Sequence, residues 1–218
     1  FSQVDVLCNT SISWNTIRYQ RNQQNYRMLL AICQMIIEGL LQTDQQGTYH
    51  VRKWMDTQHM SHLYERFILA YYQRHFPTLS VSVPQIPWSL DEGDGELLPV
   101  MQTDMQLEQG GNVLIIDAKY YRHILQSRYE TVKLRSAHLY QIFTYVKNRA
   151  YERQDGHRVS GMLLYAGTDE ALQPDHIYQM HGNQIEVKTL DLSRPFEEIA
   201  GALDAIVNTY FPSCFVRK

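Results

Sequence analysis

The sequence contains little cysteine, and the cysteines follow no recognisable spacing. Only three of the 218 residues are cysteine, Cys8, Cys33 and Cys214, and no two of them form a Cys-x-x-Cys pair. An odd number of widely separated cysteines argues against a disulfide framework and against the paired thiols of a zinc site. We therefore expect reduced thiols in a cytoplasmic protein, with Cys33 in the core of an apolar helix.

Long hydrophobic runs are also absent. The longest candidate, residues 28–41, is interrupted by Gln34 and Glu38, so it does not predict a transmembrane helix. We recognise no signal peptide, and no Gly-x-x-x-x-Gly-Lys-Ser/Thr phosphate-binding loop occurs in the chain. The sequence thus predicts no contact with a membrane and no nucleotide hydrolysis by this chain.

Positive charge is missing from one long stretch. Residues 81–118 contain seven acids and no Lys or Arg, whereas residues 119–158 contain nine Lys or Arg and three acids. The net charge of the whole chain is −3, which by itself does not indicate nucleic-acid binding. An acidic pocket beside a basic surface suits a metal site that receives a polyanion, but an ordinary solvated helix explains the basic residues equally well.

The order of hydrophobic patterns predicts a mixed α/β domain. Helical patterns cover residues 22–42, 56–76, 133–151 and 195–210. Strand patterns cover residues 79–83, 98–107, 112–120, 159–165, 176–181 and 184–190, with hairpin turns at 109–112 and 182–183. We predict a central sheet covered on both sides by helices, and a loop at residues 84–96.

One apolar strand carries two charged residues at its end. Asp117 and Lys119 follow the apolar run at residues 113–116, and the two-residue period of a strand places both side chains on one face. A buried carboxylate is unfavourable unless it is paired or binds a metal. A surface ion pair is the simplest interpretation, but the four preceding apolar residues favour a functional pair.

Asp104 lies thirteen residues before Asp117, on what would be the adjacent strand. Two acids and a lysine at a strand end suit a divalent cation and an attacking water, as in a metal-dependent phosphodiesterase. Asp104, Asp117 and the backbone carbonyl of Ala118 are the predicted metal ligands. Lys119 would orient or deprotonate the water, and Glu65 on the preceding helix would complete the coordination shell or position a second ion.

Two further sets of residues are weaker candidates. Gln141 and Tyr145 are four residues apart on one helix face, which suits contact with DNA, contact with the catalytic cluster or an ordinary helix surface. His59, His62 and Glu65 recur every third residue and drift around the helix, which favours solvated histidines over a metal site.

The segments around these residues resemble a known family. An acid on one strand followed by (D/E)-x-K on the next is the pattern of the PD-(D/E)xK nucleases. Residues 98–121, LPVMQTDMQLEQGGNVLIIDAKYY, and residues 138–148, HLYQIFTYVKN, resemble the nuclease part of the McrC-like subunits of McrBC methylation-dependent restriction systems. Residues 63–68, LYERFI, fit the helix that precedes the nuclease sheet in that family.

The resemblance implies a restriction-endonuclease-like α/β fold, in which helices flank a central mixed sheet. The catalytic acids of the family fall on Asp104 and Asp117, its lysine on Lys119 and its supporting helix glutamate on Glu65. Asp104, Asp117 and Lys119 are the residues that the strand pattern had already singled out.

The resemblance also assigns the helix pair and shows one departure. The Gln-x-x-x-Tyr helix motif of the family, which RecB-like nucleases share, falls on Gln141 and Tyr145. The proline of the superfamily motif is not adjacent to Asp104, because Pro99 lies five residues earlier.

Domain organisation and partners follow from the same resemblance. Residues 51–218 correspond to the nuclease domain, and we expect residues 1–50 to be a helical remnant of a larger N-terminal region. In this family that region engages an AAA+ GTPase, McrB, which recognises modified DNA and translocates. The expected partners are therefore DNA and a McrB-like GTPase, and the expected cofactor is Mg²⁺, with Mn²⁺ as a substitute.

The predicted function is that of a metal-dependent DNA endonuclease subunit in a modification-dependent restriction system. Two alternatives stay open at the level of the sequence. A RecB-like exonuclease or repair nuclease would require DNA ends, whereas an endonuclease cuts circular DNA. A non-catalytic scaffold would activate the GTPase without any metal-dependent cleavage.

Overall fold

The computed structural model describes residues 57–120, 125–128, 131–153, 156–167 and 173–212, together with Leu30 and Cys33. The expected N-terminal region at residues 1–50, including nearly all of the predicted helix at 22–42, lies outside the described residues. Leu30 and Cys33 are helical and partly buried, so Cys33 is less enclosed than a core residue. Its partial burial raises the pKa of the Cys33 thiol.

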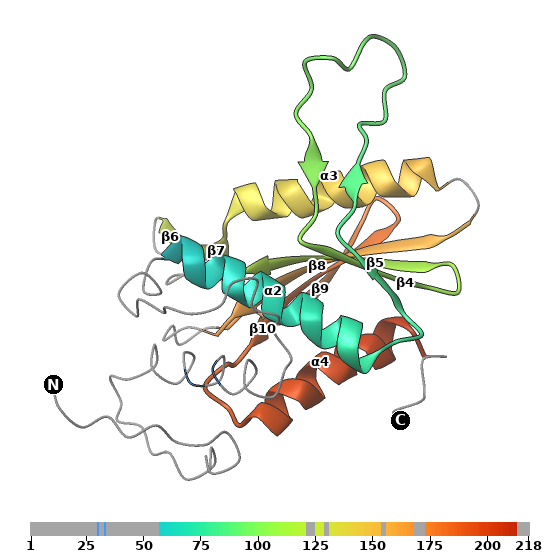
Figure 1. Ribbon diagram of the computed structural model, residues 1–218. Helices are drawn as coiled ribbons and strands as arrows, with labels where there is room; N and C mark the ends of the chain where they lie inside the picture. The colour runs from blue at the N-terminus through green and yellow to red at the C-terminus, as the bar shows by residue number, and fades with distance from the viewer. Residues whose placement is uncertain are drawn as a thin grey trace, which may run out of the picture.

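A six-stranded mixed sheet forms the centre of the molecule, in the order β1-β4-β5-β8-β10-β9 (Figure 1). The strands are β1 (Ser80–Ser82), β4 (Met105–Gln109), β5 (Asn112–Lys119), β8 (Arg158–Ala166), β9 (His176–Met180) and β10 (Asn183–Leu190). The three central strands β5, β8 and β10 run parallel, and the flanking pairs are antiparallel. The carboxyl ends of the three parallel strands therefore meet at one edge of the sheet.

Helices cover both faces of this sheet, which confirms the predicted layers. Helices α2 (Thr57–His75) and α4 (Phe196–Tyr210) lie on one face, and α3 (Ser136–Glu152) lies on the other (Figure 1). None of the described helices is both long and apolar enough to cross a membrane.

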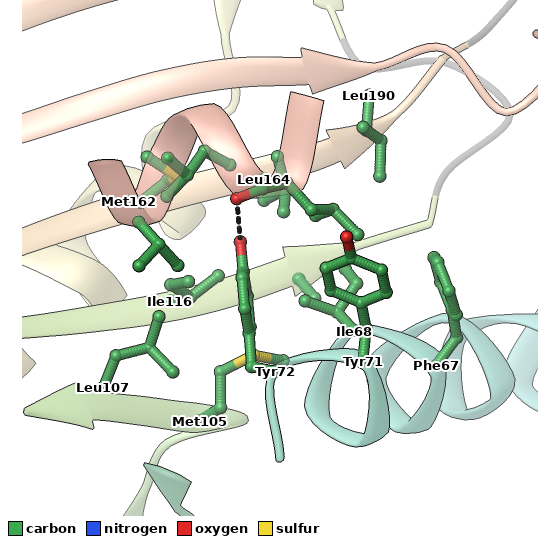
Figure 2. Close-up of a cluster of buried hydrophobic side chains, with 14 of the residues drawn as sticks. Phe67, Ile68, Tyr71, Tyr72, Met105, Leu107, Ile116, Met162, Leu164 and Leu190 are labelled. Carbon is green, nitrogen blue, oxygen red and sulfur yellow. Dashed lines mark hydrogen bonds between the residues drawn. The ribbon is translucent and has the colours of Figure 1, made fainter. Parts of the chain in front are cut away.

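The aromatic face of α2 anchors that helix to the sheet and to α4. Phe67, Tyr71 and Tyr72 point from α2 into the buried cluster, towards the side chains of the central strands (Figure 2). The Tyr71 hydroxyl donates a hydrogen bond of 2.6 Å to Asp204 Oδ1, and the Tyr72 hydroxyl donates one of 3.4 Å to the Leu203 carbonyl. These bonds satisfy buried hydroxyls that would otherwise destabilise the core.

Alternation along β5 decides which face carries the charged residues. Leu114, Ile116 and Ala118 belong to the cluster beneath α2 and α4, whereas Val113 and Ile115 belong to the cluster beneath α3. Because successive side chains alternate, residues 117 and 119 emerge on the α3 side of the sheet.

Gly161 lies on β8 where α3 crosses the sheet. A Cβ at this position would lie 2.6 Å from Val146 Cγ2 and 2.8 Å from Ile142 Cγ1, so Gly161→Ala should force α3 away from the sheet. We expect the free energy of unfolding, measured by urea denaturation, to fall by about 1–3 kcal/mol. A Cβ at Gly201 on α4 would meet nothing within 4 Å, so Gly201→Ala should raise stability by about 0.5–1 kcal/mol. Equal losses in the two variants would contradict the close packing of α3.

The predicted loop at residues 84–96 differs from the structure in one respect. It contains the short strand β2 (Gln85–Ile86), which pairs with β3 (Met101–Gln102). The segment between these strands projects beyond α3 (Figure 1). Leu97 at 97% exposure is the most exposed large hydrophobic residue described in the protein.

Three predicted boundaries also shift. The single strand predicted at residues 98–107 is two strands, β3 and β4, which are separated by Thr103 and Asp104. Residues 133–134 belong to β7 (Thr131–Leu134), which pairs with β6 (Leu125–Arg128), so α3 begins at Ser136 and not at residue 133. Strand propensity of β-branched residues accounts for this, since Thr and Val open β7. The second hairpin turns at His181 and Gly182, with φ values of 49° and 84°, which is the backbone that a two-residue hairpin requires.

Candidate active site

The β4–β5 hairpin brings the two predicted acids together. Met105 pairs with Ile116, so Asp104, directly before β4, lies opposite Asp117. Asp104 Oδ2 accepts a hydrogen bond of 2.8 Å from the backbone N–H of Ala118. The tight turn depends on Gly110 and Gly111, whose φ values of 55° and 80° are in the left-handed region. The predicted proximity of the acids is confirmed.

Asp117 is a buried carboxylate with an incomplete set of partners. Its side chain is 1% exposed, and Lys119 Nζ lies 2.8 Å from Oδ1. That contact is an ion pair, and within the described residues no backbone N–H or hydroxyl group donates to either carboxylate oxygen. Desolvation raises the pKa of Asp117 to about 7; the Lys119 ammonium opposes the rise, and Asp104 adds to it.

Glu65 approaches this pair from the other side of the sheet. It lies on α2, accepts a 3.3 Å hydrogen bond from the Ser61 hydroxyl and has His62 Nδ1 at 3.7 Å. Partial burial raises the pKa of Glu65, Asp104 adds to the rise, and Lys119 is one of the charges that lower it. Glu65 is therefore within electrostatic range of the site, although the described residues include no group of three His, Cys, Asp or Glu placed to hold a metal ion.

The predicted helix pair forms a unit on α3. Gln141 Nε2 donates a hydrogen bond of 2.9 Å to the Tyr145 hydroxyl. Tyr145 is buried in the α3-side cluster, which also contains β5 residues, so the pair lies on the helix that covers the face of Asp117 and Lys119. Contact of this pair with DNA or with the catalytic cluster stays a prediction.

The exposed side chain of His62 agrees with a solvated histidine, and that of His59 lies outside the described residues.

Two arginines of the predicted basic surface attach α3 to β4. Arg153 donates hydrogen bonds of 2.6 and 2.8 Å to the two carboxylate oxygens of Glu108, and Arg149 Nε donates one of 3.0 Å to Gln106 Oε1. Bidentate arginine–carboxylate pairs are geometrically specific. They hold α3 against the strand that follows Asp104, and they reduce the positive charge available to a polyanion.

Sequence reasoning missed a second (D/E)-x-K sequence, Glu186 to Lys188 on β10. Glu186 is buried, but Tyr210 donates a 2.7 Å hydrogen bond to Oε2 and Lys188 Nζ lies 3.3 Å from Oε1. Its neighbours in sequence, Ile185 and Val187, belong to the α3-side cluster, so Glu186 faces the opposite side of the sheet from Asp117. Of these two acids, Asp117 is the one that combines incomplete hydrogen bonding with a second acid directly opposite.

Sequence reasoning also missed His138 and Tyr165. His138 Nδ1 and the Tyr165 hydroxyl oxygen lie 2.7 Å apart, and both side chains are buried. Tyr165 pairs in register with Lys119 across β8 and β5, and His138 precedes Gln141 by one helical turn. The sequence offered one signal for each residue. Tyr165 lies at the end of a strand, as Lys119 does, and His138 shares a helix face with Gln141.

The arrangement fits a divalent cation with oxygen ligands. Asp117 supplies buried carboxylate oxygens that lack well-directed donors, Asp104 supplies a second carboxylate, and Ala118 lies between Asp117 and Lys119 with its backbone at the same strand end. Hard cations such as Mg²⁺ take carboxylate and carbonyl oxygens together with water. Binding would favour the ionised form of Asp117, which burial otherwise disfavours.

Known proteins resemble this chain over most of its length. The family model described as McrBC 5-methylcytosine restriction system component matches residues 1–166. The chain is 27% identical over 194 residues to the type IV methyl-directed restriction enzyme EcoKMcrBC of Escherichia coli (strain K12), covering 87% of this chain and 55% of that protein. The chain therefore spans about half the length of this curated relative.

A solved structure also matches, more distantly. It is a refined half-complex from a tetradecameric assembly of Thermococcus gammatolerans McrB AAA+ hexamers with bound McrC. The match covers 90% of this chain and 41% of the other chain, at 16% identity and a TM-score of 0.49.

Proposed function

Because the chain belongs to the family of McrBC 5-methylcytosine restriction system components, we propose that it contains the metal-dependent endonuclease domain of such a system. The observation that carries this proposal is the buried Asp117, ion-paired with Lys119 and opposite Asp104 at the end of β5. A buried carboxylate whose neighbours are one lysine and a second acid is typical of a functional site.

The proposed fold is a PD-(D/E)xK core within residues 51–218. The β4–β5 hairpin carries the acid on one strand and the D-x-K sequence on the next, with α2 and α3 on opposite faces. Asp104, Asp117 and the Ala118 carbonyl would hold Mg²⁺ or Mn²⁺, which would supply Lewis-acid stabilisation of the phosphate and an activated water. Lys119 places its ammonium beside Asp117, where it offsets phosphate charge and orients the attacking water.

The proposed substrate and partners derive from family membership. A relative named as a methyl-directed restriction enzyme supports methylated DNA as the substrate, in the cytoplasm where such DNA would be met. The proposed partner is a McrB-like AAA+ GTPase that recognises the modified DNA. Gln141 and Tyr145 lie on the helix above the site and are the proposed contacts to DNA or to the catalytic cluster.

Circular DNA tests the proposal and separates its rivals. The full-length protein would be mixed with its GTPase partner, GTP and Mg²⁺, and with circular DNA that either contains or lacks 5-methylcytosine. An endonuclease linearises the methylated circle and leaves the unmethylated circle intact. Degradation of linear DNA alone would identify an exonuclease. Stimulated GTP hydrolysis with no cleavage at any metal concentration would identify a non-catalytic scaffold.

Glu65→Gln should weaken cleavage without abolishing it. The substitution keeps the size of the side chain and removes a negative charge that lies within electrostatic range of Asp104 and Lys119. Substituting a group that positions the metal ligands without binding the metal typically lowers activity by about 10–100-fold. We expect the rate of methylated-circle cleavage to fall by about tenfold. Glu198→Gln, an exposed acid on α4, is the matched control and should cut normally. An unchanged rate in Glu65→Gln would exclude Glu65 from the site.

A further inference from the structure

His138 and Tyr165 form a polar pair that the proposed chemistry does not yet use. The His138 side chain is 7% exposed and the Tyr165 side chain 0%, and a 2.7 Å hydrogen bond joins Nδ1 to the phenol hydroxyl. The bond runs in one direction or the other according to the imidazole tautomer. A polar pair enclosed to this degree fixes the orientation of both rings.

The pair lies next to Lys119. Tyr165 is the register partner of Lys119 on parallel strands, so both side chains leave the sheet on the α3 face. His138 lies in the first turn of α3, within electrostatic range of the Lys119 ammonium. Burial above all, then the charges of Lys119 and Arg135, lower the pKa of His138 to about 4, so the imidazole is neutral at pH 7.

The sheet order places this pair and Asp104 on opposite sides of Lys119, whereas Asp117 lies two residues before Lys119 on the same strand. Asp104 precedes β4, which pairs with one edge of β5, and Tyr165 lies on β8, which pairs with the other edge. The Lys119 side chain is 13% exposed, so its neighbours largely determine its direction. Its ammonium is paired with Asp117 on its own strand. Asp104 lies on the β4 side, and the hydrogen-bonded His138 and Tyr165 rings lie on the β8 side.

We propose that His138 and Tyr165 are positioning residues whose hydrogen-bonded rings form the β8-side wall that keeps the Lys119 ammonium in its place beside Asp117. This inference rests on the proposed nuclease function. It adds to that function a pair on α3 and β8 that sets the geometry of the lysine without touching DNA or the metal.

Single-turnover cleavage of methylated circular DNA by the full-length protein with its GTPase partner tests the proposal. Tyr165→Phe and His138→Leu each break the hydrogen bond and should lower the maximal rate by about tenfold, with the protein concentration at half-maximal rate unchanged within about twofold. The double variant should be no slower than either single variant, because both act through one bond. His138→Asn should recover the rate to within about threefold of wild type, because an amide offers either a donor or an acceptor near the position of Nδ1.

Tyr210→Phe is the matched control for lost stability. It removes a hydroxyl that bonds to Glu186 and Gln184 on β10, whose side chains face the side of the sheet opposite to Lys119. Thermal unfolding should show comparable destabilisation in Tyr210→Phe and Tyr165→Phe, while only Tyr165→Phe loses cleavage rate.

The outcomes separate this inference from the proposed function. If wild type cuts and His138→Leu cuts equally fast, the positioning role is wrong and the nuclease stands. The positioning role is also wrong if the two single losses multiply in the double variant, if His138→Asn is as slow as His138→Leu, or if Tyr210→Phe is equally slow. If wild type itself does not cut under any condition, the nuclease function and the positioning role both fall.

Discussion

DNA cleavage by the Asp117→Ala variant is expected to fall by about a thousandfold or more, because the change removes both a metal ligand and the partner of Lys119. The assay is the rate of methylated-circle cleavage by the full-length protein with its GTPase partner, GTP and Mg²⁺. The fold should survive, since alanine fits where a carboxylate with few favourable contacts was buried. Stimulation of GTP hydrolysis by the partner should therefore persist.

Glu186→Ala is the matched control for this prediction. It also removes a buried acid that is paired with a lysine two residues later, but on the opposite face of the sheet and with its oxygens bonded to Tyr210 and Lys188. We expect it to lose stability and to keep its cleavage rate. Full cleavage by Asp117→Ala, or a loss of cleavage in Glu186→Ala as large as that in Asp117→Ala, would contradict the assignment of the site.

Without divalent metal, Asp117→Asn is expected to be more stable than wild type at pH 8. The folded protein holds the pKa of Asp117 at about 7, above the 3.8 of an unperturbed aspartate, so the folded state binds the proton more tightly than the unfolded state. The stability that this carboxyl contributes is complete below pH 4 and is lost as pH rises towards 7. Asparagine does not titrate and loses nothing, so the difference at pH 8 should be on the order of 4 kcal/mol and should shrink towards pH 4.

Urea denaturation in a chelating buffer between pH 4 and pH 8 measures this difference. Mg²⁺ added at pH 8 should then raise the free energy of unfolding of wild type and leave that of Asp117→Asn nearly unchanged, because an ion that binds only the folded state stabilises by mass action. A wild-type stability that is flat from pH 4 to pH 8 would show that the charge of Asp117 is fully compensated in the fold.

Periodicity and turn residues in the sequence were sufficient to predict the layers of the fold. The apolar run before Asp117 and the paired glycines at 110 and 111 predicted the β4–β5 hairpin, and the structure confirms both. These signals are local, because strand alternation and a glycine turn act over a few residues. They fixed the spacing that brings Asp104 opposite Asp117.

Side-chain partners from distant segments could not be predicted in this way. Arg149 and Arg153 looked like part of a basic surface, yet they are bonded to β4 side chains more than forty residues away in sequence. The hydrogen bond between His138 and Tyr165 likewise joins a helix to a strand that follows it by 27 residues. Such pairs depend on the exact position of the helix on the sheet. Composition and periodicity do not determine that position.

The two (D/E)-x-K sequences show the same limit most clearly. As residue patterns, Asp117 to Lys119 and Glu186 to Lys188 both combine a carboxylate with a lysine two positions later on a strand with apolar neighbours. The structure separates them through their surroundings, because Glu186 has a tyrosine donor and Asp117 has a second acid. The apolar run before Asp117 and the spacing of Asp104 selected the first pair from sequence, the family resemblance agreed with that choice, and the geometry explains why that pair is chemically different.

Mapping the bound metal by local oxidation tests the central claim most directly. Fe²⁺ would replace Mg²⁺ in the full-length protein, and ascorbate with peroxide would generate hydroxyl radicals that break the backbone beside the bound ion. We predict fragments that end near residues 104 and 117–118, which excess Mg²⁺ suppresses and which Asp117→Ala does not give. Fragments that map elsewhere, or that persist unchanged in Asp117→Ala, would show that these two acids do not hold the metal.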